Sequence, residues 1–448
     1  MVQYLNKICE FASTLSFSDL SPEIVKRANF VLLDTIGVIA AGAQEPEVAV
    51  FVEQLDPPAG RATLFGQEHT ADPLNGALIN GTAGTFLELD EGNQFCRGHA
   101  AIHVVPALLA LAEERGLSGR DVIVALVAGY EIAARIGIAS KIRMSMHPHG
   151  TWGTIGAAVA VGRAALLNAA AIKELVNISS SMCLATSRKT MLEGATVRNV
   201  YAGVSNYMGL LSLKLFNAGI TGEKDGLTTV YGSVISDSFD QTAIQEDLGS
   251  RFEITRNYFK MHACCRYNHS ALDALLEIAS RFPDEHIPAE DVAEVKVETY
   301  SLAAQLCDAK PRNMLAAKFS IPFAIATCLT NGDTGVDAFR QEKINDCAIM
   351  SLAQKVKVLE KTEYTAMMPE RRPSLVTLCM KDGTTHTAET FLNKGDFEAP
   401  YSDSEIQDKF LGLAKTVWGS SRSEEILAQL MHLETIKNIN DITSMLGR

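Results

Sequence analysis

The chain has 448 residues, of which 47% are hydrophobic and 21% are charged, and this composition is typical of a globular protein with a large core. Its net charge of −13 argues against a nucleic-acid-binding protein, because neutralising phosphates needs a basic face. A cationic pocket can still exist inside an acidic protein, so an anionic small substrate stays open.

The first residues contain no apolar stretch of the kind that signal peptides have. The most apolar stretch, residues 156–172, carries Arg163 and is predicted to be one buried helix and not a membrane span. Nine cysteines form no CxxC pair, which favours reduced thiols over a disulfide framework or a zinc site. We therefore expect a cytoplasmic protein that contacts neither membrane nor nucleic acid.

The region up to about residue 255 is predicted to be helical almost throughout. Apolar residues repeat at helical spacing from Tyr4 to Leu15. Ser21-Pro22-Glu23 begins a helix that extends towards Gly42, and Ser118 with Asp121 has the spacing of a capping box. Residues 153–168 and 197–216 are rich in small side chains, which suits helices that pack closely.

The pattern changes near residue 290. Residues 292–300 alternate apolar and polar side chains as a half-buried strand does. Residues 374–380 and 384–391 flank Asp382-Gly383 and predict a hairpin, with helices at 270–282 and 316–331. Helical pattern returns at Ser402. We predict a mainly α protein: a large all-α domain (1–257 and 402–448) with a smaller, inserted, lid-like α+β domain (258–401).

Two segments combine acidic or glycine residues with histidines. Glu88, Asp90 and Glu91 precede His99, and a carboxylate beside an imidazole orients the ring and sets its pKa for proton transfer. The second segment, residues 146–156, contains His147 and leads through glycines into a helix, whose first backbone N–H groups can hold a carboxylate.

Two further segments carry cations. Residues 188–199 contain Lys189 and Arg198, and residues 260–269 contain Lys260, Arg266 and His269. Common nucleotide, zinc and serine-nucleophile motifs are missing from the sequence. We therefore expect no metal and no organic cofactor.

Several strings resemble the MmgE/PrpD family in the right order along most of the chain. These are residues 87–91 with His99 and residues 106–113, then residues 147–158, 217–222, 264–269 and 317–322. The family includes dehydratases, decarboxylases and epimerases of small polycarboxylic acids. The resemblance implies a helical domain with an inserted α+β domain, as the pattern predicts, and it implies a homodimer.

The resemblance also implies where the active site lies. The family's acidic pair falls on Asp90 and Glu91, its two histidines on His99 and His147, and its two lysines on Lys189 and Lys260.

Three positions depart from the family pattern. Leu192 stands where many members have a histidine. Cys265 and Phe323 stand where the decarboxylase-like members have a histidine and a tyrosine. These losses argue against decarboxylation of cis-aconitate.

We expect an enzyme that removes the proton alpha to a carboxylate of a small di- or tricarboxylic acid. His99 or His147 is the base, oriented by Asp90 or Glu91, and Lys189, which we group with these catalytic residues, holds a carboxylate. Carboxylates are bound by a second set: Lys260, Arg266, Arg198 and His269. Loss of a β-hydroxyl makes the enzyme a dehydratase. Return of the proton on the other face makes it an epimerase of an iminodisuccinate-like dicarboxylate. A non-catalytic interaction protein on the same scaffold is the third possibility.

Overall fold

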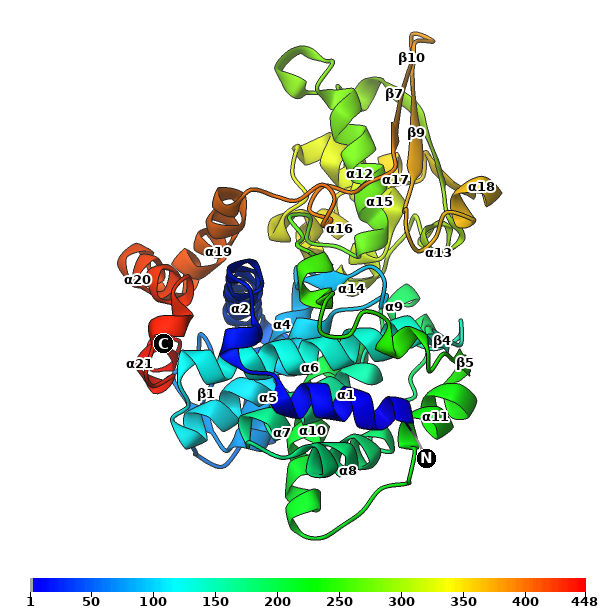
Figure 1. The fold of residues 1–448 in the computed structure, drawn as a ribbon. Helices are drawn as coiled ribbons and strands as arrows, with labels where there is room; N and C mark the ends of the chain where they lie inside the picture. Colours follow the sequence, from blue (N-terminus) through cyan, green and yellow to red (C-terminus); the bar gives the residue numbers. More distant parts are fainter. Residues whose placement is uncertain (1–2) are drawn as a thin grey trace.

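The structure, a computed structural model, describes residues 3–448, and its hydrophobic side chains form two large clusters. One cluster takes its buried residues from Tyr4 to Phe259 and from Tyr401 to Leu446. The other takes nearly all of its buried residues from Ala263 to Ala388. Figure 1 shows the smaller α+β part above the helical part. The prediction of a mainly α fold with a smaller α+β portion is confirmed.

Long helices that pack on one another form the larger part. Ser21 caps α2 (Pro22–Gly42), and Ser118 with Asp121 forms a capping box on α6 (Gly119–Ala139), as the sequence predicts. The other helices of this part are α1 (Gln3–Thr14), α3 (Pro46–Leu55), α4 (Pro73–Phe86), α5 (Ala100–Arg115), α7 (Trp152–Ala164), α8 (Ala169–Ser180), α9 (Lys189–Leu192), α10 (Tyr201–Asn217) and α11 (Gly226–Thr229).

Helix α6 is long and apolar enough to cross a membrane by length and composition. However, 94% of its most apolar 18-residue window is buried inside the protein. It packs against α5 and α7, where glycines such as Gly156 allow close contact between the helices. Its burial is that of a core helix.

The prediction of one helix over residues 156–172 is wrong. Helix α7 ends at Ala164, and Leu166 has a positive φ of 57° and is exposed. Asn168 then caps α8 by accepting a hydrogen bond from the Ala171 N–H. A left-handed residue followed by a new N-cap stops one helix and starts the next, although the apolar composition continues.

The smaller part is built on a four-stranded sheet with the order β10-β9-β7-β8. The predicted strand is β7 (Val292–Thr299), and the predicted hairpin is β9 (Ser374–Met380) with β10 (Thr385–Thr390). Strand β8 (Val356–Glu360) lies parallel to β7 and was not predicted. The helices here are α12 (Arg266–Ala279), α13 (Ser301–Ala304), α14 (Met314–Lys318), α15 (Ile321–Asn331), α16 (Gln341–Ile344), α17 (Cys347–Ala353) and α18 (Thr362–Thr365).

The C-terminal helices return to the helical part. Ser402 and Glu405 form the predicted capping box on α19 (Asp403–Trp418), which packs against α2. Helices α20 (Ser420–Leu430) and α21 (Asn440–Thr443) follow, and α20 packs against α2 (Figure 1).

Three short antiparallel ribbons in the helical part were not predicted. They are β1 (Ala62–Thr63) with β2 (Thr70–Ala71), β3 (Gly92–Asn93) with β6 (Asn257–Tyr258), and β4 (Ser140–Ile142) with β5 (Ser236–Phe239). The β3–β6 pair matters for the site, because it ties the segment before His99 to the segment before Lys260.

Candidate active site

A cavity lies where the segments singled out in the sequence meet. Its walls come from both parts of the fold. The lining residues are Glu88, Arg97, Gly98, His99, His147, Pro148, His149, Arg188, Met191, Arg198, Tyr258, Cys265, Arg266, Tyr267, Phe319 and Arg372. Five arginines and one carboxylate make this wall strongly cationic in a protein whose net charge is negative.

The backbone before α5 places His99 at the cavity. The Asn93 and Gly98 backbones exchange two hydrogen bonds and close a tight loop. Gly98 permits this loop to lie against Trp152, because a Cβ atom there would come within 2.4 Å of the indole ring. His99 then stands at the N-cap position of α5.

Two oxygen atoms determine which ring nitrogen of His99 carries the proton. The ring atom Nδ1 lies 2.6 Å from the backbone oxygen of Glu91 and 3.0 Å from Oδ2 of Asp90. Both neighbours only accept hydrogen bonds, so Nδ1 carries the proton when the ring is neutral. Nε2 of the same ring is then unprotonated and available as a base.

Asp90 is a buried carboxylate held in its charged form. Burial opposes ionisation, but the charges of His99 and Lys260 outweigh it and lower the pKa of Asp90 below its usual value. Lys260 Nζ lies 3.5 Å from Asp90 Oδ1 and donates a hydrogen bond to the Glu88 backbone oxygen at 2.8 Å. Asp90 therefore stays negative beside His99 and stabilises the imidazolium formed when the ring takes a proton.

Glu91 orients His99 through its backbone and not through its carboxyl group. Its side chain accepts a hydrogen bond from the Ala101 N–H at 2.8 Å and lies 3.3 Å from the Tyr130 hydroxyl. Burial raises the pKa of Glu91 to about 8. The carboxyl group is thus largely neutral at pH 7 and supports the start of α5.

His147 reaches the cavity by pairing with the chain before α9. The His147 N–H donates to the Thr186 oxygen and the Arg188 N–H to the Ser145 oxygen, so the two segments run side by side. Nδ1 of His147 accepts a hydrogen bond from the His149 N–H at 3.1 Å. In the neutral ring Nε2 therefore carries the proton. His147 is arranged as a proton donor, opposite to His99.

His149 was singled out only as part of its segment, and the structure places it between the other rings. Its centroid lies 4.9 Å from those of His99 and His147 and 5.0 Å from that of His103. Burial lowers the pKa values of His147 and His149 well below the usual value, and that of His103 to about 3. These three rings are neutral at pH 7.

The predicted carboxylate-binding residues already have partners in the protein. Arg198 pairs with Glu88 across the cavity wall. Arg266 donates to Oδ1 of Asp396 at 2.6 Å, and its Nη1 lies 2.8 Å from Nδ1 of His269. Arg198 and Arg266 line the cavity, whereas Lys260 and His269 are fully buried behind its wall.

Lys189 does not line the cavity. Its side chain is exposed, and the preceding residue, Arg188, is buried and lines the cavity instead. Successive residues of a helical turn point about 100° apart, so neighbours in the sequence face different surroundings.

The structure adds Arg97, Arg188 and Arg372 to the predicted cations. Arg188 directly precedes the predicted Lys189, and that position in the cationic segment is the signal that the sequence carries for it. Arg372 comes from the loop before β9, in a stretch with no recognisable motif, and its Nη2 donates to the Gln94 backbone oxygen at 2.9 Å. No sequence signal pointed to it.

The three departures from the family pattern lie in different places. Cys265 lines the cavity, and burial raises the pKa of its thiol. Leu192 packs beside the second hydrophobic cluster, and Phe323 is fully buried inside it. Within residues 3–448, no group of three or more histidine, cysteine or acidic side chains is arranged to hold a metal ion.

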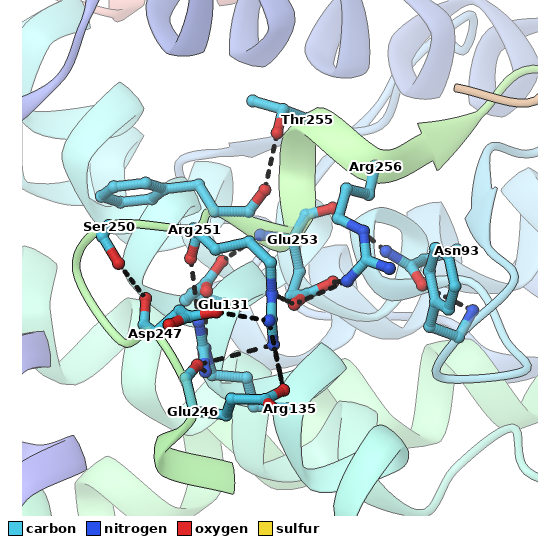
Figure 2. Close-up of polar contacts among 12 residues, drawn as sticks. Asn93, Glu131, Arg135, Glu246, Asp247, Ser250, Arg251, Glu253, Thr255 and Arg256 are labelled. Carbon is cyan, nitrogen blue, oxygen red and sulfur yellow. Dashed lines mark hydrogen bonds and ion pairs between the residues drawn. The ribbon is translucent and has the colours of Figure 1, made fainter. Parts of the chain in front are cut away.

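A network of buried charges supports the segment before His99 (Figure 2). Arg135 lies 2.6 Å from Glu131 and donates to the backbone oxygens of Glu246 and Arg251. Oε2 of Glu131 accepts from the Glu253 N–H at 2.6 Å, and the Glu253 oxygen accepts from the Asn93 side chain at 3.0 Å. The network fastens residues 246–253 to α6 and to the loop that ends at His99.

Comparison with known proteins adds two family models and a set of relatives. The model of the MmgE/PrpD N-terminal domain matches residues 6–242, and that of the MmgE/PrpD C-terminal domain matches residues 262–434. A cis-aconitate decarboxylase-like protein of Aspergillus oryzae is 23% identical, with 98% of this chain and 96% of the relative aligned. A cis-aconitate decarboxylase of Aspergillus terreus is 24% identical (99% and 95%), and that of Mus musculus is 22% identical (96% and 91%).

Proposed function

Because the chain belongs to the MmgE/PrpD family, we propose that it is a lyase that removes the proton alpha to a carboxylate of a small di- or tricarboxylic acid. The relatives, named cis-aconitate decarboxylases, support an enzyme acting on a carboxylic acid. The observation that carries the proposal is the pair of cavity histidines whose protons are arranged in opposite ways.

The first step is removal of the alpha proton by His99. Its Nε2 is the unprotonated atom of the neutral ring, because Nδ1 faces the Glu91 backbone oxygen and Asp90. The C–H bond breaks, the proton joins Nε2, and the electron pair moves towards the carboxylate. Asp90 then faces an imidazolium, which its negative charge stabilises.

The second step is loss of a hydroxyl group from the β-carbon. His147 donates a hydrogen bond from Nε2 to the departing oxygen, which takes the proton held by His99 and leaves as water, and a carbon–carbon double bond forms. A hydroxy acid thereby becomes an unsaturated acid, and both His99 and His147 end in the neutral forms in which they started. The arginines of the cavity wall stabilise the negative charge that develops between the two steps.

Epimerisation of a dicarboxylate is the second candidate. A base and a proton donor in one cavity can remove a proton from one face and return a proton to the other. Cys265 lines the cavity at the position where decarboxylase-like members have a histidine. His147 is therefore the remaining histidine arranged to donate from its ring N–H. An iminodisuccinate-like substrate, which has no β-hydroxyl group, would use the same residues.

Incubation with a panel of acids in deuterium oxide tests the proposal. The panel contains citrate, 2-methylcitrate, cis-aconitate and aspartate-like acids, and NMR follows the alpha proton while chromatography follows products. The proposal expects exchange at the alpha carbon with one of them, together with gain or loss of water. Exchange with inversion and no water loss supports the epimerase. Carbon dioxide from cis-aconitate without prior exchange, or no reaction with any acid, contradicts the proposal.

A further inference from the structure

Five arginines are buried within residues 3–448, and they fall into two groups. Arg135, Arg198 and Arg266 each form an ion pair with a buried carboxylate, from Glu131, Glu88 and Asp396. Arg188 and Arg372 have no carboxylate within 4 Å in the described chain. Both of these line the candidate active-site cavity.

The polar atoms of these two arginines are incompletely bonded. Nε and Nη2 of Arg188 and Nε of Arg372 are buried without a hydrogen-bond partner among the described residues. Some atoms of Arg198 and Arg266 are too, but these two arginines lie beside carboxylates. A buried cation without a partner is costly, because burial removes its hydration. A lysine escapes this cost by losing its proton, and burial lowers the pKa of Lys318 to about 8. Arginine stays charged, so an anion must compensate it.

Tyr267 holds both guanidinium groups at one place. The Cζ atom of Arg188 lies 5.8 Å from the centre of the Tyr267 ring, and that of Arg372 lies 5.5 Å from the same centre. Arg188 comes from the helical part of the fold and Arg372 from the loop before β9 in the smaller part. An anion beside this ring contacts both parts at once.

We propose that Arg188 and Arg372 are the principal carboxylate-binding residues of this site, holding carboxylate groups of a polycarboxylate from the two parts of the fold. The planar guanidinium group suits a carboxylate because two parallel N–H donors match its two oxygens. Arg198 and Arg266, whose charges Glu88 and Asp396 already neutralise, mainly shape the wall. That the bound polycarboxylate is a substrate rests on the proposed function, whereas the binding itself rests on the geometry alone.

Calorimetric titration with citrate and with tricarballylate, which has no hydroxyl group, tests this inference without requiring turnover. Arg188→Gln and Arg372→Gln should each weaken binding roughly tenfold or more, because each removes a charged hydrogen-bonding partner. Arg371→Gln is the matched control: Arg371 is the half-buried neighbour of Arg372, pairs with Glu398 and does not line the cavity. It should bind as the wild type does.

Unchanged affinity in both cavity variants, or no binding of either acid to the wild type at millimolar concentration, overturns the inference. Arg372→Lys keeps a charge but loses the two parallel donors, and it should bind with intermediate affinity; it also replaces Arg372→Gln if that variant fails to fold. The same titration with His99→Gln separates the two proposals. Citrate binding that persists there, in a protein that exchanges no alpha proton, supports the carboxylate site whatever the reaction proves to be.

Discussion

Two regions of this protein contain buried arginines, and they differ in whether a carboxylate lies beside the guanidinium group. In the network around Arg135, the guanidinium group meets the Glu131 carboxylate and the backbone oxygens of Glu246 and Arg251 (Figure 2). In the cavity, Arg188 and Arg372 have no carboxylate, and their free N–H groups are enclosed. The paired Arg135 stabilises the fold. The unpaired Arg188 and Arg372 lower the stability of the fold, and a bound anion restores it.

The largest effect is expected from breaking the compensated region. Arg135→Met removes the cation beside Glu131 and the donor of the Glu246 and Arg251 backbone oxygens, which should lower the free energy of unfolding by about 3–5 kcal/mol. Urea denaturation measures this change. Arg281→Met, which breaks an exposed ion pair with Glu277, is the control and should change stability by less than about 1 kcal/mol. A loss of similar size in both variants would mean that the network is no more important than a surface pair.

The next effect concerns the two histidines of the cavity. His99→Gln should lower the rate of alpha-proton exchange about a hundredfold or more, with a smaller change in KM, because a base acts in the transition state. His147→Gln should leave exchange measurable while product formation falls, because His147 donates in the later step. Exchange rates by NMR and product formation by chromatography separate the two. Loss of exchange in His147→Gln with retention in His99→Gln would reverse the assignment.

A smaller effect is expected from pH. Burial lowers the pKa of His103 to about 3 in the fold, below its value in the unfolded chain, so the unfolded chain binds more protons below about pH 6.5. The stability that neutral His103 contributes is present above that pH and is lost as the pH falls towards 3. His103→Met should reduce the pH dependence of unfolding between pH 6.5 and 5 by up to about 1.4 kcal/mol per pH unit. An unchanged slope would contradict this.

Removing Arg372 from the cavity should change the free energy of unfolding in the opposite direction to removing Arg135 from the network. Without ligand, Arg372→Gln should leave the free energy of unfolding unchanged or raise it by up to about 1 kcal/mol, because it removes an unpaired buried charge. Thermal denaturation of the variant and of the wild type in a buffer without polyvalent anions measures this. A loss above about 2 kcal/mol would show that Arg372 is a structural residue.

The smallest effect is expected at Lys189. The family resemblance gives this residue a role in the active site, whereas its side chain is exposed and outside the cavity. Lys189→Gln should therefore change kcat/KM by about twofold or less, as surface substitutions do. Steady-state kinetics with the acid identified in the exchange panel measures it, beside Arg188→Gln, whose KM should rise strongly. A large effect of Lys189→Gln would favour the resemblance over the placement.

Local patterns predicted much of the fold. Capping residues such as Ser118 and Ser402, and the Asp382-Gly383 turn, act within a few residues, so the sequence shows them directly. The ribbons β3–β6 and β4–β5 could not be predicted, because their strands are two to four residues long and pair across long stretches of chain. Residues 156–172 were misjudged because apolar composition hides the left-handed turn at Leu166.

The sequence predicted those residues of the candidate site that belong to short polar segments of the chain. The histidines His99 and His147 line the cavity, but their proton arrangement depends on the Glu91 oxygen and the His149 N–H, which are contacts in space. Which cations lack a partner is likewise invisible in the sequence, since Asp396 reaches Arg266 across 130 positions. Arg372 carried no local signal at all.

A crystal structure with citrate or tricarballylate bound tests the central claim most directly. The account predicts carboxylate oxygens within hydrogen-bond distance of Arg372 Nε and of the free N–H groups of Arg188. It also predicts that the carbon alpha to one carboxylate faces Nε2 of His99. An acid bound elsewhere, or bound in this cavity through Arg198 and Arg266 while Arg188 and Arg372 make no contact with it, would contradict the account.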